Sequence, residues 1–321
     1  MHRSLKRTSK ILLTVLLLGT SYCALAAWPE KPIVMVVPFP PGGNTDTLGR
    51  LVAQKLSTSL GQPVIVENKP GAGSMIGSQV VARAKPDGYT FLMGSIANVL
   101  NNFFYKKPLY DISKDLMPIS QLVAVPNYLA VNNSVNAKSV SDVIAMAKAT
   151  PEKVSCASSG VGTSPYLSCE LIRTMIGVKM ITVAYKGGAP AMQDVMGGQA
   201  TMVIANEALP YIKDKRLKGI AVTTATRTPL APDLPAIAET LPGFDVTSWY
   251  GVFAPTDTPQ EIVNKISAEI ASLLKTPDVQ KRLEALGATP VGSSPKEFGE
   301  YVNAELKRWE TTLKLMNISL D

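Results

Sequence analysis

The chain has 321 residues, and its 32 lysines and arginines against 25 aspartates and glutamates give a formal net charge of +7 at pH 7. Its single histidine is His2, so no imidazole is present beyond the extreme N-terminus. A Ser-His-Asp triad, a Cys-His pair and a metal site with histidine ligands are therefore excluded from the rest of the chain. Paired carboxylates or a Ser-Lys pair stay formally open, but no spacing favours either. We expect no catalytic residues, no metal and no cofactor.

The N-terminus has the organisation of a secretory signal peptide. Basic residues precede the apolar stretch Ile11 to Leu18, which is about half as long as a membrane-spanning helix. Small residues at Ala24 and Ala26 predict cleavage near Ala26, so residues 1–26 are interpreted as a signal peptide and the mature chain as periplasmic. Lipidation of Cys23 is the alternative, although Tyr22 stands where a lipoprotein signal has a small residue.

The mature chain is only mildly basic. Cleavage lowers the number of lysines and arginines from 32 to 28 against 25 acidic residues, which leaves a net charge of +3. No run of basic residues interleaved with aromatic ones follows, so the sequence carries no electrostatic signature of nucleic-acid binding. Roughly 295 residues remain, enough for two domains of ordinary size. We expect a monomer.

Short β-branched runs alternate with longer stretches of helical periodicity in the first part of the mature chain. Such alternation is typical of βαβ units, in which a mostly parallel sheet is flanked by helices. Glycine-rich or proline-containing turns separate the elements at residues 38–44, 71–77 and 85–88. The predicted strands are residues 33–37, 64–66 and 89–93, and the predicted helices are residues 47–56 and 78–84.

The same strand-loop-helix unit returns in the second part. A strand at 154–157 and a Gly/Ser loop lead to a helix at 166–175, which Pro165 opens from a first helical position. Strands at 180–184, 200–205 and 219–223 follow, whereas the amphipathic segments 259–274, 277–286 and 295–315 are predicted to be helices that cover the first sheet. We therefore expect an α/β fold of two domains, residues 27–128 with 251–321 and residues 129–250, joined by a hinge.

Two loops with similar chemistry precede predicted helices. In the loop of residues 40–46, backbone N–H groups at a helix N-terminus can receive an anion, and glycine lets the ligand approach the backbone. Asn44, Thr45 or Asp46 can instead simply cap the helix, which requires no ligand. The loop of residues 158–164 offers hydroxyls and amides from the other domain. Together the two loops can clamp one anion.

Other glycine and cysteine patterns are less specific. Residues 71–77 superficially resemble a dinucleotide fingerprint, but the last glycine comes one residue too late and the expected acidic residue is not convincing. Segments 185–188 and 206–207 lie at strand ends, where ligands of open α/β sheets bind but where plain turns are also common. Cys156 and Cys169 either form a disulfide or remain two small buried thiols, and both readings stay open.

A series of short motifs runs along essentially the whole mature chain. They are Trp28-Pro29, Val36 to Phe39, Gly42 to Asp46, Glu67 to Gly73, Lys85 to Thr90, Ser158, Gly160 to Thr163, Tyr185 to Gly187, Gly197 to Gln199, Arg227, Pro232, Pro235, Glu239, Trp249 to Gly251, Ala254-Pro255 and Thr258-Pro259. In this order they resemble the Bug-type solute-binding receptors of tripartite tricarboxylate transporters.

The resemblance implies a two-domain periplasmic binding fold of the Venus flytrap kind, similar to type II. Such a receptor closes by a hinge on a small carboxylate, here a di- or tricarboxylate, an amino acid or an aromatic acid, and then docks on a membrane permease. Amides, hydroxyls and waters hold the carboxylate, which is adequate without a salt bridge because hydrogen bonds to a charged acceptor are strong. Carried over by position, the ligand-binding residues are Gly43, Asn44, Thr45, Asp46, Ser95, Gly162, Thr163, Ser164 and Asn206.

Two positions depart from the family pattern close to the expected cleft. Tyr166 stands before Leu167 where the family usually has a histidine, and Ala184 stands before Tyr185 where it usually has a proline. These changes either alter which ligand fits the cleft or merely change the packing of its wall. An extracytoplasmic sensor that presents its closed form to a signalling membrane protein is the alternative function.

Overall fold

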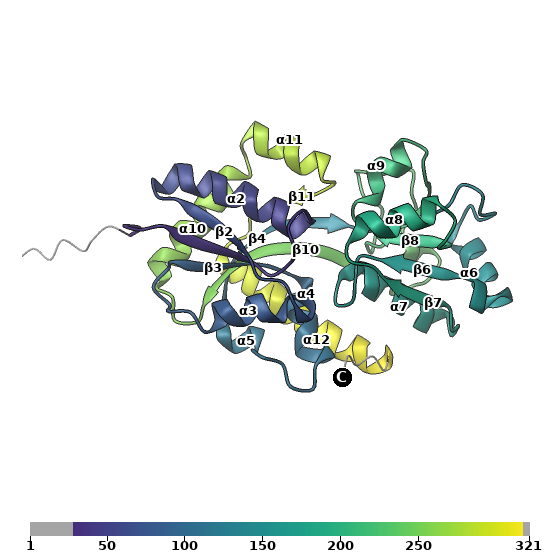
Figure 1. Ribbon diagram of the computed structural model, residues 1–321, viewed down its shortest axis with the longest axis horizontal. Coiled ribbons are helices and arrows are strands. Elements are labelled where there is room, and N and C mark those ends of the chain that lie inside the picture. Colours follow the sequence, from purple (N-terminus) through teal and green to yellow (C-terminus); the bar gives the residue numbers. More distant parts are fainter. Residues whose placement is uncertain (1–27, 317–321) are drawn as a thin grey trace, which may run out of the picture.

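The computed structural model describes residues 28–316, so the predicted signal peptide lies outside the described residues. Two lobes lie side by side, each built on one β-sheet with helices on its faces (Figure 1). The predicted two-domain α/β architecture is confirmed. Within residues 28–316, no helix is both long and apolar enough to cross a membrane.

The first sheet contains six strands in the order β11-β4-β10-β3-β1-β2. Strand β1 pairs in parallel with β2 and β3, whereas β10 runs antiparallel to both β3 and β4. The strands are β1 (Ile33–Val37), β2 (Val64–Asn68), β3 (Thr90–Ser95), β4 (Leu116–Pro126), β10 (Thr247–Pro255) and β11 (Thr289–Pro290).

The second sheet contains five strands in the order β7-β6-β8-β5-β9. Strand β6 pairs in parallel with β7 and β8, whereas β5 runs antiparallel to β8 and β9. The strands are β5 (Tyr128–Val131), β6 (Ser155–Ser158), β7 (Ile181–Ala184), β8 (Met202–Ala205) and β9 (Lys218–Val222).

Both sheets are mixed, and in this detail the prediction of mostly parallel sheets was wrong. The chain leaves the first sheet through β4 and enters the second through β5, and it returns through β10. Because the outgoing and returning strands run in opposite directions, β4 and β10 pair antiparallel over their length. Sheet membership changes between Pro126 and Tyr128 and again between Val222 and Thr247. The exact domain limits stay a prediction.

The predicted helices are present within a few residues of their expected limits. Helix α3 begins earlier than expected, because residues 72–74 already form a 3₁₀ turn that leads straight into it. The helices are α2 (Asn44–Leu60), α3 (Met75–Ala82), α4 (Ile96–Phe104), α5 (Ile112–Asp115), α6 (Val140–Ala149), α7 (Ser164–Ile176), α8 (Gly188–Met196), α9 (Ala208–Lys213), α10 (Gln260–Leu273), α11 (Pro277–Ala285) and α12 (Pro295–Met316).

Helix α2 shows how periodicity places a helix on the first sheet. Leu48, Leu51, Val52 and Leu56 lie on one face, and each is at most 5% exposed. They pack in one core cluster with residues of β1 and α10. Burying each such side chain contributes about 1.5–3 kcal/mol, so this face anchors the helix and fixes the position of its N-terminus.

Helix α12 packs on β4, as expected for a helix that covers the first sheet, and also contacts α7 of the second lobe. Its Glu305 is buried, and Oε2 accepts hydrogen bonds of 3.1 Å from the indole nitrogens of both Trp249 and Trp309. Arg308 pairs with Glu305 and with Asp245, the latter just before β10. Helix α12 therefore braces the strand through which the chain crosses between the lobes.

A disulfide joins Cys156 of β6 to Cys169 of α7, with the two Cα atoms 5.9 Å apart. Both cysteines are fully buried. The bond fastens helix α7 to the second sheet, and the N-terminus of this helix faces the first lobe.

Candidate functional site

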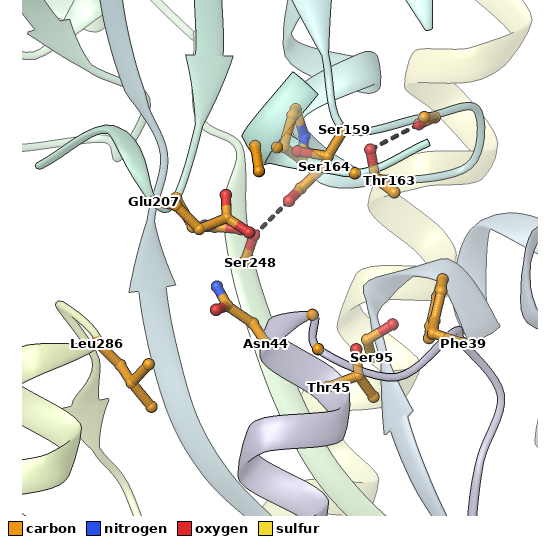
Figure 2. A pocket seen from close by; sticks show the side chains of 18 of the residues that line it. Phe39, Asn44, Thr45, Ser95, Ser159, Thr163, Ser164, Glu207, Ser248 and Leu286 are labelled. Carbon is orange, nitrogen blue, oxygen red and sulfur yellow. Dashed lines mark hydrogen bonds between the residues drawn. The ribbon is translucent and has the colours of Figure 1, made fainter. Parts of the chain in front are cut away.

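A cleft of about 1470 Å³ lies between the two lobes and is lined by residues from both. The first lobe contributes the loop before α2, the loop before α3 and the start of α4. The second lobe contributes the loop before α7 and the first turns of α8 and α9, while β10 and the end of α11 complete the lining (Figure 2). Ligand pockets commonly measure about 300–1,000 Å³, so this space is a wide cleft that admits a small molecule from solvent.

The N-terminus of α2 opens into this cleft. Gly43 is the N-cap residue, with φ −83° and ψ 172°, and no side chain caps the helix. Gly43, Asn44 and Thr45 line the cleft, and their role in binding a ligand stays a prediction. The simple capping role considered from the sequence is therefore not realised. The first backbone N–H groups of a 17-residue helix face a cleft in which they can receive an anion.

Asp46 stands behind this loop and is not part of the cleft lining. Its Oδ2 accepts hydrogen bonds of 3.0 Å from the backbone N–H of Gly42 and from Arg50 Nε, and its Oδ1 accepts one of 2.8 Å from Asn68. Burial alone would raise the pKa of Asp46, but these hydrogen bonds hold it below its usual value. Asp46 therefore positions the loop, and both of its carboxylate oxygens already accept hydrogen bonds within the protein.

The N-terminus of α7 faces the cleft from the second lobe. Thr163 is its N-cap and accepts a hydrogen bond of 3.4 Å from the N–H of Tyr166, while its own hydroxyl donates to the carbonyl of Gly160 at 2.7 Å. Thr163 and Ser164 line the cleft, whereas Gly162 does not. A Cβ atom at Gly162 would lie 3.8 Å from Cα of Gly73, so the loops of the two lobes meet there.

Ser95 also lines the cleft, at the start of α4. Its hydroxyl accepts a hydrogen bond of 3.4 Å from the N–H of Ala97, and Oδ1 of Asn98 accepts one of 2.7 Å from its backbone N–H. This capping box fixes Ser95 in place. The side chain thus combines a structural role with a position on the cleft wall.

Ser164 and Asn206 meet at the base of the cleft in a buried polar network. Asn206 Nδ2 donates to the carbonyl of Pro126 at 3.0 Å, to Asn127 Oδ1 at 2.8 Å and to Ser248 Oγ at 3.0 Å. Ser164 also hydrogen-bonds to Ser248, a contact drawn in Figure 2. The network ties the outgoing crossing at residues 126–127 to the returning strand β10. Both predicted ligand residues are thus already engaged in joining the lobes.

Ser248 and Tyr250, both of β10, were not predicted as ligand-binding residues. Tyr250 of β10 lines the cleft and forms a side-chain hydrogen bond with Asn44. Burial raises the pKa of Tyr250 far above its ordinary value, the charge of Glu207 adds to this rise, and the hydrogen bond with Asn44 opposes it. Because side chains alternate along a strand, a strand at 247–255 would have placed Ser248 and Tyr250 on one face. That strand was not predicted.

The two departures from the family pattern lie outside the cleft lining. Tyr166 is in the first turn of α7, and Ala184 ends β7. Within the part of the chain that the structure describes, no group of three or more His, Cys, Asp or Glu side chains is placed to hold a metal ion.

Residues 48–318 match the family described as the tripartite tricarboxylate transporter family receptor. The chain belongs to this family. The receptor is also similar to solved structures across nearly its whole length: Rpa4515 of R. palustris with adipate shares 37% identity at a TM-score of 0.84, covering 91% of this chain and 99% of that one. The periplasmic binding protein BugD shares 33% identity at 0.83, covering 91% and 99%.

MatC of Rhodopseudomonas palustris with bound malate shares 33% identity with the receptor at a TM-score of 0.80, covering 89% of this chain and 100% of that one. The resemblance to Bug-type receptors is therefore confirmed. The protein is a periplasmic solute-binding receptor of this family, and the family is one of substrate-binding receptors.

Proposed function

We propose that the receptor captures a small carboxylate in the cleft and delivers it to a membrane permease of the tripartite tricarboxylate type. The uncapped N-terminus of α2 carries the proposal, because its N–H groups and the positive end of the helix dipole favour an anion. The ligands named for the related structures, adipate and malate, are both carboxylates and support this chemistry.

Closure of the lobes follows from the way the chain crosses between them. The two lobes are linked by β4 leading into β5 and by the return through β10, and backbone changes at these crossings can alter the angle between the lobes. A ligand that contacts α2 from one lobe and α7 from the other stabilises the closed form. We propose that the permease recognises this closed form.

Export to the periplasm fits the same proposal. The charged and apolar pattern of residues 1–26 is that of a signal peptide cleaved near Ala26. The disulfide between Cys156 and Cys169 suits an oxidising compartment.

A thermal-shift screen of the purified mature protein tests the proposal, since a ligand that binds only the folded state raises the melting temperature. The protein is refolded and dialysed first, and the panel holds mono-, di- and tricarboxylates, amino acids and aromatic acids, with neutral sugars and nucleosides as controls. A saturable shift confined to carboxylates is expected. Shifts with sugars or nucleosides alone would overturn the assignment of a carboxylate ligand.

A further inference from the structure

Glu207 is a carboxylate of the cleft, and one of its two oxygens has no hydrogen-bond partner in the protein. It lies two residues after the end of β8, as the N-cap of the short helix α9, and is part of the cleft lining. Its Oε2 is shielded from solvent and has no hydrogen-bond partner, and no lysine or arginine of the described residues lies within salt-bridge distance of it. A shielded carboxylate oxygen without a partner is costly in a folded protein, so this group calls for an explanation.

The backbone of α8 confines this carboxylate. A Cβ atom at Gly188, the first residue of that helix, would lie 2.5 Å from Oε2 and 2.9 Å from Cδ of Glu207. The carboxylate therefore packs directly against a glycine backbone and lacks room on that side. Burial raises the pKa of Glu207 above its ordinary value.

The carboxylate is also close to the proposed anion site. The charge of Glu207 raises the pKa of Tyr250, and a hydrogen bond with Asn44 lowers it, so both residues act on the same tyrosine. In the view of Figure 2, Glu207 and Asn44 point into the cleft from different lobes. Glu207, Tyr250 and Asn44 all line the same cleft. A single molecule bound in this cleft can therefore contact both Glu207 and the N-terminus of α2.

We propose that Glu207 is a specificity-determining residue that binds an ammonium group of the ligand, so that the substrate is an amino-substituted carboxylic acid. The inference rests on the proposed function, because the N-terminus of α2 holds the carboxylate of the same molecule. An ionised carboxylate accepts hydrogen bonds and cannot donate them, so a cationic donor is its natural partner. The ligand then offsets the cost of burying an unpaired charge.

Isothermal titration of matched acids tests the assignment: succinate against aspartate, glutarate against glutamate, and butyrate against 4-aminobutyrate. The wild-type receptor is expected to bind one of the amino-bearing acids at least about 30-fold more tightly than its unsubstituted partner. Glu207→Gln, which keeps the size of the side chain, should remove this preference. Glu284→Gln is the matched control, because it removes an exposed acid from the lining of the same cleft.

The pH dependence of binding supplies a second readout. Binding of the amino acid should strengthen as the pH rises through the raised pKa of Glu207, because only the ionised form attracts an ammonium group, and Glu207→Gln should abolish this trend. The other charged or titratable groups of the cleft lining remain in that variant and give the baseline: Lys186, Tyr211, Lys213, Asp214, Tyr250, Lys281 and Glu284.

The outcomes separate the two proposals. If unsubstituted acids bind as well as amino acids, or if Glu207→Gln weakens both equally, the specificity assignment fails while the carboxylate receptor stands. Binding of a dicarboxylate that weakens as the pH rises, with the trend lost in Glu207→Gln, would show a protonated Glu207 donating to the ligand and would also overturn the assignment. If no acid of either series binds, the specificity assignment fails, and the wider carboxylate panel of the thermal-shift screen decides whether the proposed carboxylate receptor stands.

Discussion

The N–H group of Asn44 is expected to contribute directly to ligand binding, and replacing this residue by proline tests it. Proline at the first position of α2 removes one backbone donor while keeping the helical φ. Gly43, which precedes it, has φ −83° and ψ 172°, a conformation that a following proline permits. The substitution is therefore expected to leave the helix intact.

The magnitude follows from the kind of hydrogen bond that is lost. A hydrogen bond to a charged acceptor contributes about 1.5–3 kcal/mol, which corresponds to a loss in affinity of about 10- to 150-fold. Asn44→Ala is the matched control, because both variants lose the side-chain hydrogen bond with Tyr250 and only Asn44→Pro loses the backbone donor. The difference between them isolates the N–H group.

Isothermal titration with the acid identified by thermal shift measures both variants, and their melting temperatures report on folding. Asn44→Pro is expected to bind at least about tenfold more weakly than Asn44→Ala at a similar melting temperature. Equal affinities of the two variants would refute the assignment of the α2 N-terminus as the anion site, whatever ligand the cleft holds.

Three further predictions concern the framework of the site. Glu305→Ala leaves the indole N–H groups of Trp249 and Trp309 without their acceptor and should lower the free energy of unfolding by about 2–5 kcal/mol, measured by urea denaturation. The control is Glu310→Ala, which removes an exposed ion pair with Lys314 on the same helix and should change the free energy of unfolding by less than about 0.5 kcal/mol. Equal effects of Glu305→Ala and Glu310→Ala would contradict a bracing role for Glu305. The disulfide joins residues 13 positions apart, and its reduction should lower the free energy of unfolding by about 3 kcal/mol. The measurement is the melting temperature with dithiothreitol, and an unchanged melting temperature would contradict a stabilising role of the bond. Asp46→Asn should destabilise the protein at pH 7, because the depressed pKa of Asp46 stabilises the fold above the ordinary pKa of about 3.9. The difference in stability between wild type and variant should shrink as the pH falls through the lower pKa of the folded state. A difference that does not depend on pH would refute this role.

Local sequence was informative wherever short-range physics decides the outcome. The spacing of Leu48, Leu51, Val52 and Leu56 predicted the buried face of α2, because residues three and four apart share one face of a helix. The position of Pro165 likewise predicted the start of α7. Strand β10 escaped prediction because eight of its nine residues are buried, so no alternation of apolar and polar residues marks it.

The loops that face the cleft could be recognised from the sequence, but the roles of their side chains could not. Asp46 was predicted to bind the ligand. In the structure its carboxylate accepts hydrogen bonds from Arg50 and from Asn68, which lies 22 residues further along the chain. Asn206 was predicted as a wall residue, which it is, but it also joins the two crossings through Asn127 and Ser248. Hydrogen-bond partners far apart in sequence decided both cases.

The sequence by itself determined the class of fold, the order of most elements and the two loops that face one another. Hydrophobic periodicity, glycine and proline act within a few residues, so they can be read directly from the chain. Only the tertiary structure brought Glu207, Gly188 and Tyr250 together, because these residues meet through the pairing of β5 with β8 and the return of β10 between the lobes. The unpaired carboxylate is a property of that assembly, since burial and the absence of a partner depend on every element packed around it.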